Sequence, residues 1–192
     1  MKKARQVEIP EDGNLTLKDA YELQEHAVNS AIWYAGRSSK STQQIRDKLY
    51  LKGFPRETVH AVAKDGSVHA FDFVEAAVDR LVELSFLDDE ALARGLTSEK
   101  LRLGKGLQRI RNDLRVRGIP SSIIEEVLDD VEDSAQNEAL EKAVRQVMNT
   151  SAFSRIADPR KRQEKLGRSL ASKGFAFSDI IRVLEELDEG MG

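Results

Sequence analysis

One short phrase occurs three times in this chain. The copies read IRDKLYLKGFP from Ile45, IRNDLRVRGIP from Ile110 and LGRSLASKGFA from Leu166. They begin far enough apart for each copy to belong to a module of several helices, a longer unit than the shortest solenoid repeats. This repeat constrains the fold more than any other feature, because it predicts a chain built from similar units joined in series.

Each copy has the pattern of a helix, a turn and a second helix. Apolar residues four positions apart give the first helix one buried edge in every copy. A basic residue and a glycine follow, and the glycine is predicted to end the helix in the left-handed conformation. Pro55 and Pro120 then suit the first turn of a second helix, which in the first copy would bury Val59 and Val62.

Further helices are predicted between the copies. The expected elements are Leu17 to Arg37, Phe73 to Ser85, a helix that begins at Asp88 or Asp89, and Ala139 to Val147. The STQQ stretch from Ser41 has the form of a capping box, which would begin the first helix of the first copy. We find no alternating strand pattern of useful length.

These patterns predict an all-α fold of three tandem three-helix, helix-turn-helix-like repeats that form an elongated curved array. The predicted division is a flexible N-terminal tail over residues 1–16 and repeats over residues 17–70, 71–133 and 134–192. With 33% charged and 6% aromatic residues, the composition suits a soluble helical protein with wide solvated faces.

The sequence predicts a cytoplasmic protein that does not enter a membrane. It has no cysteine, which excludes disulfides and thiolate metal sites. The longest uncharged run of apolar character, Ala27 to Gly36, is too short to span a bilayer. The first residues, MKKARQVEIPEDG, lack the apolar core of a signal peptide.

Charge is strongly segregated along a chain whose net charge is only −3. From Arg94 to Arg117 there are eight Lys or Arg against two acids, and from Arg155 to Lys173 there are seven against two. Between these stretches, Glu125 to Glu141 holds eight acids and no base. Such segregation allows a strongly positive face on a nearly neutral protein.

The sequence does not predict an enzyme, a metal site or a bound cofactor. None of the histidines has the spacing of a zinc site; they are His26, His60 and His69. The GKG at Gly104 lacks the flanking residues of a phosphate-binding loop, and no serine lies in a nucleophile elbow. The neighbouring carboxylates Asp88 and Asp89 are expected to cap a helix rather than to bind a metal.

Two interpretations apply to the basic residues. Lys52, Arg117 and Lys173 each precede the helix-ending glycine, so compensation of the helix dipole explains them as well as binding does. Arg111 and Arg115 lie four positions apart on the face away from the buried edge, which indicates a basic ridge. This ridge is either a solvated surface or a site for a polyanion or acidic partner.

The predicted binding residues extend from this ridge to the second basic stretch. They are Arg102, Lys105, Arg109, Arg111, Arg115, Arg117, Arg162, Lys165, Arg168 and Lys173. A conventional DNA recognition helix is not expected, because SSIIEEVLDD, the second helix of the middle copy, would bring four carboxylates toward the phosphates.

Three elements together resemble a known family. They are the three copies of L-x-x-K/R-G-F/I, the stretch RLVELSFLDDEALAR after the first copy, and KLRLGKGLQRIRNDLRVRGIP through the second. In these elements the chain resembles the RecX family of RecA regulators, over roughly Ala20 to Leu187.

The resemblance implies the tandem three-helix fold and a regulatory role. By resemblance, the chain binds the RecA recombinase filament on single-stranded DNA and needs no cofactor. Free DNA is a further candidate partner, and the expected state is a monomer. It would inhibit the ATPase, strand-exchange and coprotease activities of RecA in recombination, DNA repair and the SOS response. The alternative is a stand-alone DNA-binding architectural protein that acts without RecA.

Overall fold

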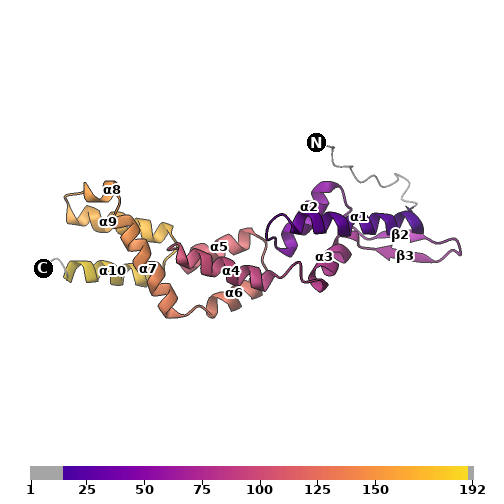
Figure 1. Ribbon diagram of the computed structural model, residues 1–192. Helices are drawn as coiled ribbons and strands as arrows, with labels where there is room; N and C mark the ends of the chain where they lie inside the picture. Colours follow the sequence, from indigo (N-terminus) through magenta and orange to yellow (C-terminus); the bar gives the residue numbers. More distant parts are fainter. Residues whose placement is uncertain (1–14, 190–192) are drawn as a thin grey trace. The chain divides into compact units, whose positions relative to one another are not determined.

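The computed structural model describes residues 15–189, and helices account for most of them (Figure 1). The predicted helical class is therefore confirmed. The chain divides into two compact units, residues 1–92 and 93–192. Of the predicted tail, residues 1–14 lie outside the described residues, and Leu15–Thr16 form a strand. The boundaries of the three repeats stay a prediction.

The first unit is built on three helices and a small sheet. Its elements are β1 (Leu15–Thr16), α1 (Leu17–Ala35), α2 (Thr42–Lys52), β2 (Val59–Val62), β3 (Val68–Phe71) and α3 (Phe73–Glu83). The helix α3 packs against both α1 and α2. Ile45, Leu49, Phe73 and Leu81 are fully buried in the shared core. These apolar side chains hold the three helices together.

The helix ends follow the sequence pattern closely. Ser41 and Gln44 form the predicted capping box at the start of α2. The glycines that end the three phrases, Gly53, Gly118 and Gly174, have φ angles of 102°, 75° and 87°. The predicted left-handed helix ends are therefore confirmed in all three copies. Glycine fits there because this conformation strains residues that carry a Cβ atom.

The prediction of a helix over Val59 and Val62 was wrong, as was the expectation that the chain lacks a useful strand pattern. These residues form β2, which pairs antiparallel with β3, while β1 pairs parallel with the other edge of β2 (Figure 1). The missed signal is the near-duplicate VHAV and VHAF on either side of AKDGS. A two-residue periodicity around Asp65–Gly66 is a hairpin pattern, and Gly66 has φ +83°.

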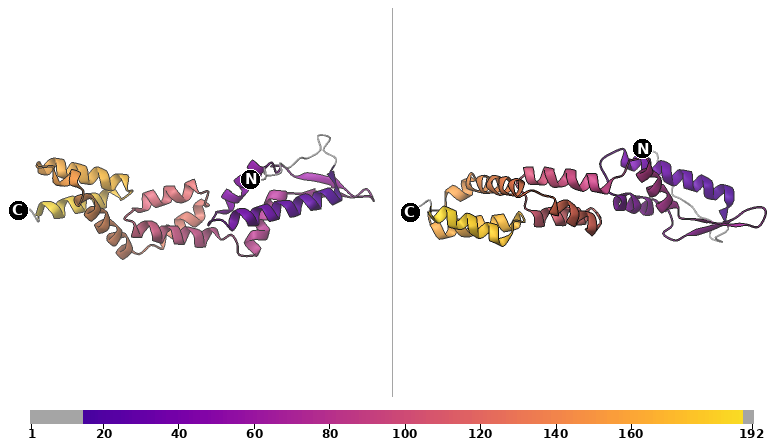
Figure 2. Two further views of the ribbon diagram at one scale, coloured as in Figure 1. Left: turned by 45° about the horizontal axis from the view of Figure 1, so that its top comes forward. Right: turned by 90° about the horizontal axis from the view of Figure 1, so that it is seen from below.

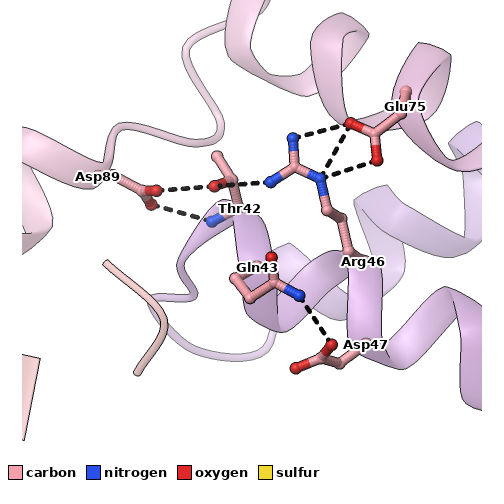
Figure 3. Close-up of polar contacts among 6 residues, drawn as sticks. All are labelled: Thr42, Gln43, Arg46, Asp47, Glu75 and Asp89. Atoms are coloured by element: carbon pink, nitrogen blue, oxygen red, sulfur yellow. Dashed lines mark hydrogen bonds and ion pairs between the residues drawn. The ribbon is translucent and has the colours of Figure 1, made fainter. Parts of the chain in front are cut away.

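The two neighbouring aspartates have different roles. Asp88 accepts a hydrogen bond from the Ala91 backbone N–H at 2.8 Å, so it caps α4 (Asp89–Arg102) as predicted. Asp89 is buried, and its carboxylate accepts bonds from the backbone N–H and the hydroxyl of Thr42, at 2.9 and 2.7 Å (Figure 3). Asp89 therefore joins the start of α4 to the start of α2.

The second unit contains the rest of α4 and six further helices among its described residues (Figure 2). They are α5 (Leu107–Val116), α6 (Ser121–Asp129), α7 (Asp133–Met148), α8 (Ser151–Ser154), α9 (Pro159–Ser172) and α10 (Phe177–Glu189). The helix α5 packs on α6, and α9 packs on both α7 and α10. Leu140, Leu166, Leu170 and Ile180 are buried in the core of these last helices.

The third phrase contacts, through backbone atoms, the residues just before the second phrase. The N–H groups of Gly106 and Gln108, at the start of α5, donate to the carbonyls of Lys173 and Gly174, at the end of α9, at 2.9 and 3.1 Å. A Cβ added at Gly106 would lie 2.3 Å from the Gly174 oxygen, and one at Gly174 would lie 2.3 Å from the Arg109 nitrogen. We call this contact the glycine junction; it satisfies helix-end groups that otherwise lack partners.

We expect Gly174→Ala to destabilise the protein much more than Gly66→Ala. Both glycines have positive φ, so each substitution strains the backbone by about 1 kcal/mol. Nothing lies within 4 Å of a Cβ at Gly66, whereas the junction would have to open at Gly174, which costs roughly 1–3 kcal/mol more. Urea unfolding of both variants measures the difference, and equal losses would contradict the junction.

Candidate nucleic-acid interface

All ten predicted binding residues lie in the second unit, but they have different neighbours. On α5, Arg109 pairs with Asp113, its Nε lying 3.1 Å from the carboxylate. Arg111 instead pairs with Glu125 on α6 at 2.7 Å. Positions two apart on a helix point in widely different directions, so Arg109 and Arg111 lie on separate sides of α5.

Arg111 is held by a two-pronged ion pair. Its Nε and one terminal nitrogen donate to the two carboxylate oxygens of Glu125, at 3.1 and 2.7 Å, and its other terminal nitrogen donates to Gln108. This hydrogen bond raises the pKa of Arg111 and lowers the pKa of Glu125. A bidentate pair of this kind fixes α6 on α5.

The first repeat contains the same kind of bidentate Arg–Glu pair at the same position of the phrase. We call such a pair between two helices an arginine clamp. Arg46, which aligns with Arg111, donates to both carboxylate oxygens of Glu75 on α3, at 2.8–2.9 Å (Figure 3). The third copy has Gly167 at this position. Because the arginine recurs with a carboxylate partner on a packed helix, its first role in this chain is structural.

The glycine junction brings two predicted lysines together. Gly106 bonds to the carbonyl of Lys173, which places Lys105 next to Lys173 although the two are far apart in sequence. The Lys173 ammonium donates to the side chain of Gln146 on α7 at 2.8 Å. Burial lowers the pKa of Lys173, and the positive charge of Lys105 lowers it further. Two cations that repel each other favour a bound anion.

Lys173 also has a structural counterpart in the first repeat. Lys52, which occupies the same place in its phrase, donates to the hydroxyl of the buried Ser30 on α1. Burial lowers the pKa of Lys52 as well. Both lysines therefore attach the end of one helix to a polar side chain of another, in addition to facing the helix dipole.

A groove runs between α4 and α5 on the side of Arg109. We call it the α4–α5 groove; its volume is about 270 Å³, and its lining includes Leu96, Lys100, Arg109, Asp113, Val116 and Arg117. Lys100 lies 3.2 Å from one carboxylate oxygen of Asp113, and Arg109 lies 3.1 Å from the other. Two predicted residues, Arg109 and Arg117, therefore line this groove together with Lys100, which was not in the predicted set.

The predicted cations of α9 contact their own unit. Lys165 donates to the carbonyl of Ala152 at 2.9 Å, and Arg162 donates to the carbonyl of Ile156, so both hold the segment around α8. Arg168 forms an ion pair with Glu164, one turn earlier on the same helix. These contacts account for much of the basic character of α9 without a ligand.

The two remaining predicted residues are exposed. Arg115 lies exposed on α5, and its positive charge adds to that of Arg111 in lowering the pKa of Glu125. Arg102 lines a groove of about 440 Å³ together with Lys142 and Arg145 of α7. Sequence reasoning missed Lys142 and Arg145 because they follow an acidic stretch, although their spacing of three along a helix indicates a shared face.

The described residues contain no group of three or more His, Asp or Glu that could hold a metal ion. Within the same part of the chain, no helix is both long and apolar enough to cross a membrane.

Two comparisons relate the sequence to known proteins. Family models for the first and the second three-helix domain of RecX match residues 27–64 and 88–128. A regulatory protein RecX from Prosthecochloris aestuarii is 34% identical over 164 residues, which make up 84% of this chain and 93% of the relative. Another from Clostridium tetani is 31% identical over 157 residues, 82% of this chain but 65% of the longer relative.

Solved structures show the same fold. The crystal structure of RecX from Lactobacillus salivarius matches with a TM-score of 0.68 at 22% identity, covering 88% of this chain and 98% of that one. A second crystal structure, of a regulatory protein RecX, matches with a TM-score of 0.69 at 22% identity, covering 90% and 79%.

We expect Arg111→Met to lower the free energy of unfolding at neutral pH, and this loss to shrink in acid. The folded-state pKa of Glu125 is depressed by Arg111, so the pair stabilises the fold above the ordinary pKa of a glutamate. That contribution disappears as the pH falls through the depressed folded-state value. Denaturant unfolding across this range measures it, with Arg102→Met, an exposed arginine of the same unit, as the control. A pH-independent loss would contradict the clamp.

Proposed function

Because the chain belongs to the family of RecX regulatory proteins, we propose that it regulates the RecA recombinase by binding RecA filaments on single-stranded DNA. The membership confirms the resemblance that the three phrases and their flanking motifs indicated. It also carries the proposal, since the match extends over nearly the full length of a regulatory relative. The proposed effect is inhibition of the ATPase, strand-exchange and coprotease activities in recombination and the SOS response.

The proposed contact surface is formed by basic residues of the second unit. All ten predicted residues lie in this unit, although Arg109 and Arg111 lie on separate sides of α5. Their neighbours distinguish the better candidates from the poorer ones. Arg102 and Arg115 are exposed, and the positive charge of Lys105 lies close enough to Lys173 to lower its pKa, so these residues are the best placed for phosphates. Arg111 is expected to contribute less directly, because it is held by Glu125.

The proposed mechanism requires no chemistry on the regulator itself. A filament alternates between states that bind, hydrolyse and release nucleotide, and a protein that prefers one state shifts the population toward it. Basic side chains would guide the chain to the DNA within the filament and raise the association rate. Contacts with RecA subunits would then supply the preference for one filament state.

A measurement of RecA-driven ATP hydrolysis with single-stranded DNA in large excess tests this function. We expect inhibition to persist, because the regulator would recognise the filament rather than remove its DNA. If excess DNA abolishes inhibition, sequestration of DNA is sufficient. The stand-alone DNA-binding protein would then be the better description.

A charge-reversal variant tests the proposed surface. We expect Lys105→Glu combined with Arg115→Glu to weaken filament binding by about tenfold or more at low salt, through loss of phosphate contacts. Lys64→Glu, an exposed change in the hairpin turn of the first unit, is the control and should bind normally. Wild-type affinity in the double variant would exclude this surface.

A further inference from the structure

We propose that the α4–α5 groove binds a phosphodiester of a single-stranded nucleic acid, and that Asp113 acts there as a built-in counterion that weakens this binding. The inference deepens the proposed function and rests on it for its biological setting. It adds Lys100 and Asp113, neither of which the basic pattern of the sequence had singled out.

The groove has an excess of positive charge around one carboxylate. Lys100, Arg109 and Arg117 line it, and among the described lining residues Asp113 is the one acid. The ammonium of Lys100 and the guanidinium of Arg109 each contact a different oxygen of that carboxylate, at 3.2 and 3.1 Å. The single negative charge of Asp113 therefore does not neutralise both Lys100 and Arg109, and this pair of cations keeps an attraction for an anion.

The two ion pairs hold the cations in place without burying them. The exposed fractions of the side chains are 31% for Lys100, 53% for Arg109 and 25% for Asp113. Lys100 comes from α4, so its pair with Asp113 crosses from one helix to the other. A phosphate approaching from solvent would meet cations that are already positioned, which lowers the entropy lost on binding.

The floor and walls of the groove strengthen the attraction. Ile110 and Leu114 are buried beneath it, and charges beside such apolar surface are screened less than charges in open water. Leu96 and the largely exposed Val116 add apolar walls that suit the face of a sugar or base. The groove is small, with a volume of about 270 Å³, so it suits a short contact with one phosphate rather than the enclosure of a whole ligand.

Asp113 makes the site reversible. A phosphate that enters must share or replace the carboxylate on Lys100 and Arg109, so part of the Coulomb energy of binding is offset by the lost ion pairs. A regulator that moves along a filament benefits from contacts that release easily. The simple alternative is that Asp113 only holds α4 to α5, and that alternative predicts no gain in affinity when its charge is removed.

The test is binding of a fluorescent oligothymidylate to the intact protein without RecA. We expect Asp113→Asn to bind about fivefold more tightly at low salt, the size expected for one partly exposed charge pair. The logarithmic salt dependence should steepen by roughly 0.7, the slope for one additional phosphate contact on a single strand. Unchanged or weaker binding would overturn the proposal.

Matched variants control for net charge and folding. Asp130→Asn removes the same charge and the 2.9 Å ion pair with Arg94 in the same unit, away from the groove, and should change affinity little. Lys100→Met should weaken binding and cancel most of the gain when combined with Asp113→Asn. Equal gains in affinity for Asp113→Asn and Asp130→Asn would show that net charge alone causes the gain, and would refute the site.

Polyglutamate serves as a second probe. If Asp113→Asn tightens polyglutamate binding as much as oligothymidylate binding, the groove recognises acidic polypeptide equally well, and the assignment to nucleic acid fails. These binding measurements test the groove separately from the proposed regulation of RecA. A protein that inhibits RecA but gains no DNA affinity from Asp113→Asn contradicts only the groove, whereas the opposite result contradicts only the regulation of RecA.

Discussion

The end-to-end contact between α9 and α5 determines how the second unit is assembled. Gly106 and Gly174 allow two backbones to approach so closely that the carbonyls at the end of one helix bond to the N–H groups at the start of another. The contact has no room for a Cβ on either side. It also places Lys105 beside Lys173, so the packing of two repeats creates a local concentration of positive charge.

Many of the charged residues form contacts that stabilise the fold, so they are less available to a ligand. Arg46 and Arg111 occupy the same position of the phrase, and each clamps its helix to the next with a glutamate. Lys52 and Lys173 likewise attach helix ends to neighbouring polar side chains. A cation that recurs at the same position of the phrase is therefore explained first by its role in stabilising the repeat. The cations outside this pattern, above all Arg115 and the set around Asp113, are the better candidates for binding.

The α4–α5 groove and the proposed regulation of RecA fit together physically. A protein that acts on a filament needs enough attraction to find the DNA and a release fast enough to respond to the state of the filament. A carboxylate shared by two cations, Lys100 and Arg109, would provide such an intermediate affinity. Charge steers the encounter, and shape decides which subunits are contacted.

The sequence by itself determined the helical class, the phrase with its left-handed glycines, the capping box and the family. Local patterns suffice for these because helix ends depend on neighbouring residues along the chain. Only the tertiary structure decided that Val59–Val62 pair as a strand, where the VHAV and VHAF duplication had been overlooked. It also decided which cations meet: Arg111 faces Glu125, Lys105 faces Lys173, and Lys100 joins Arg109 at Asp113. The Arg111–Glu125 and Lys100–Asp113 pairs each join two helices, so they depend on packing, which a pattern along one helix does not contain. Arg109 and Asp113, by contrast, lie one turn apart on α5.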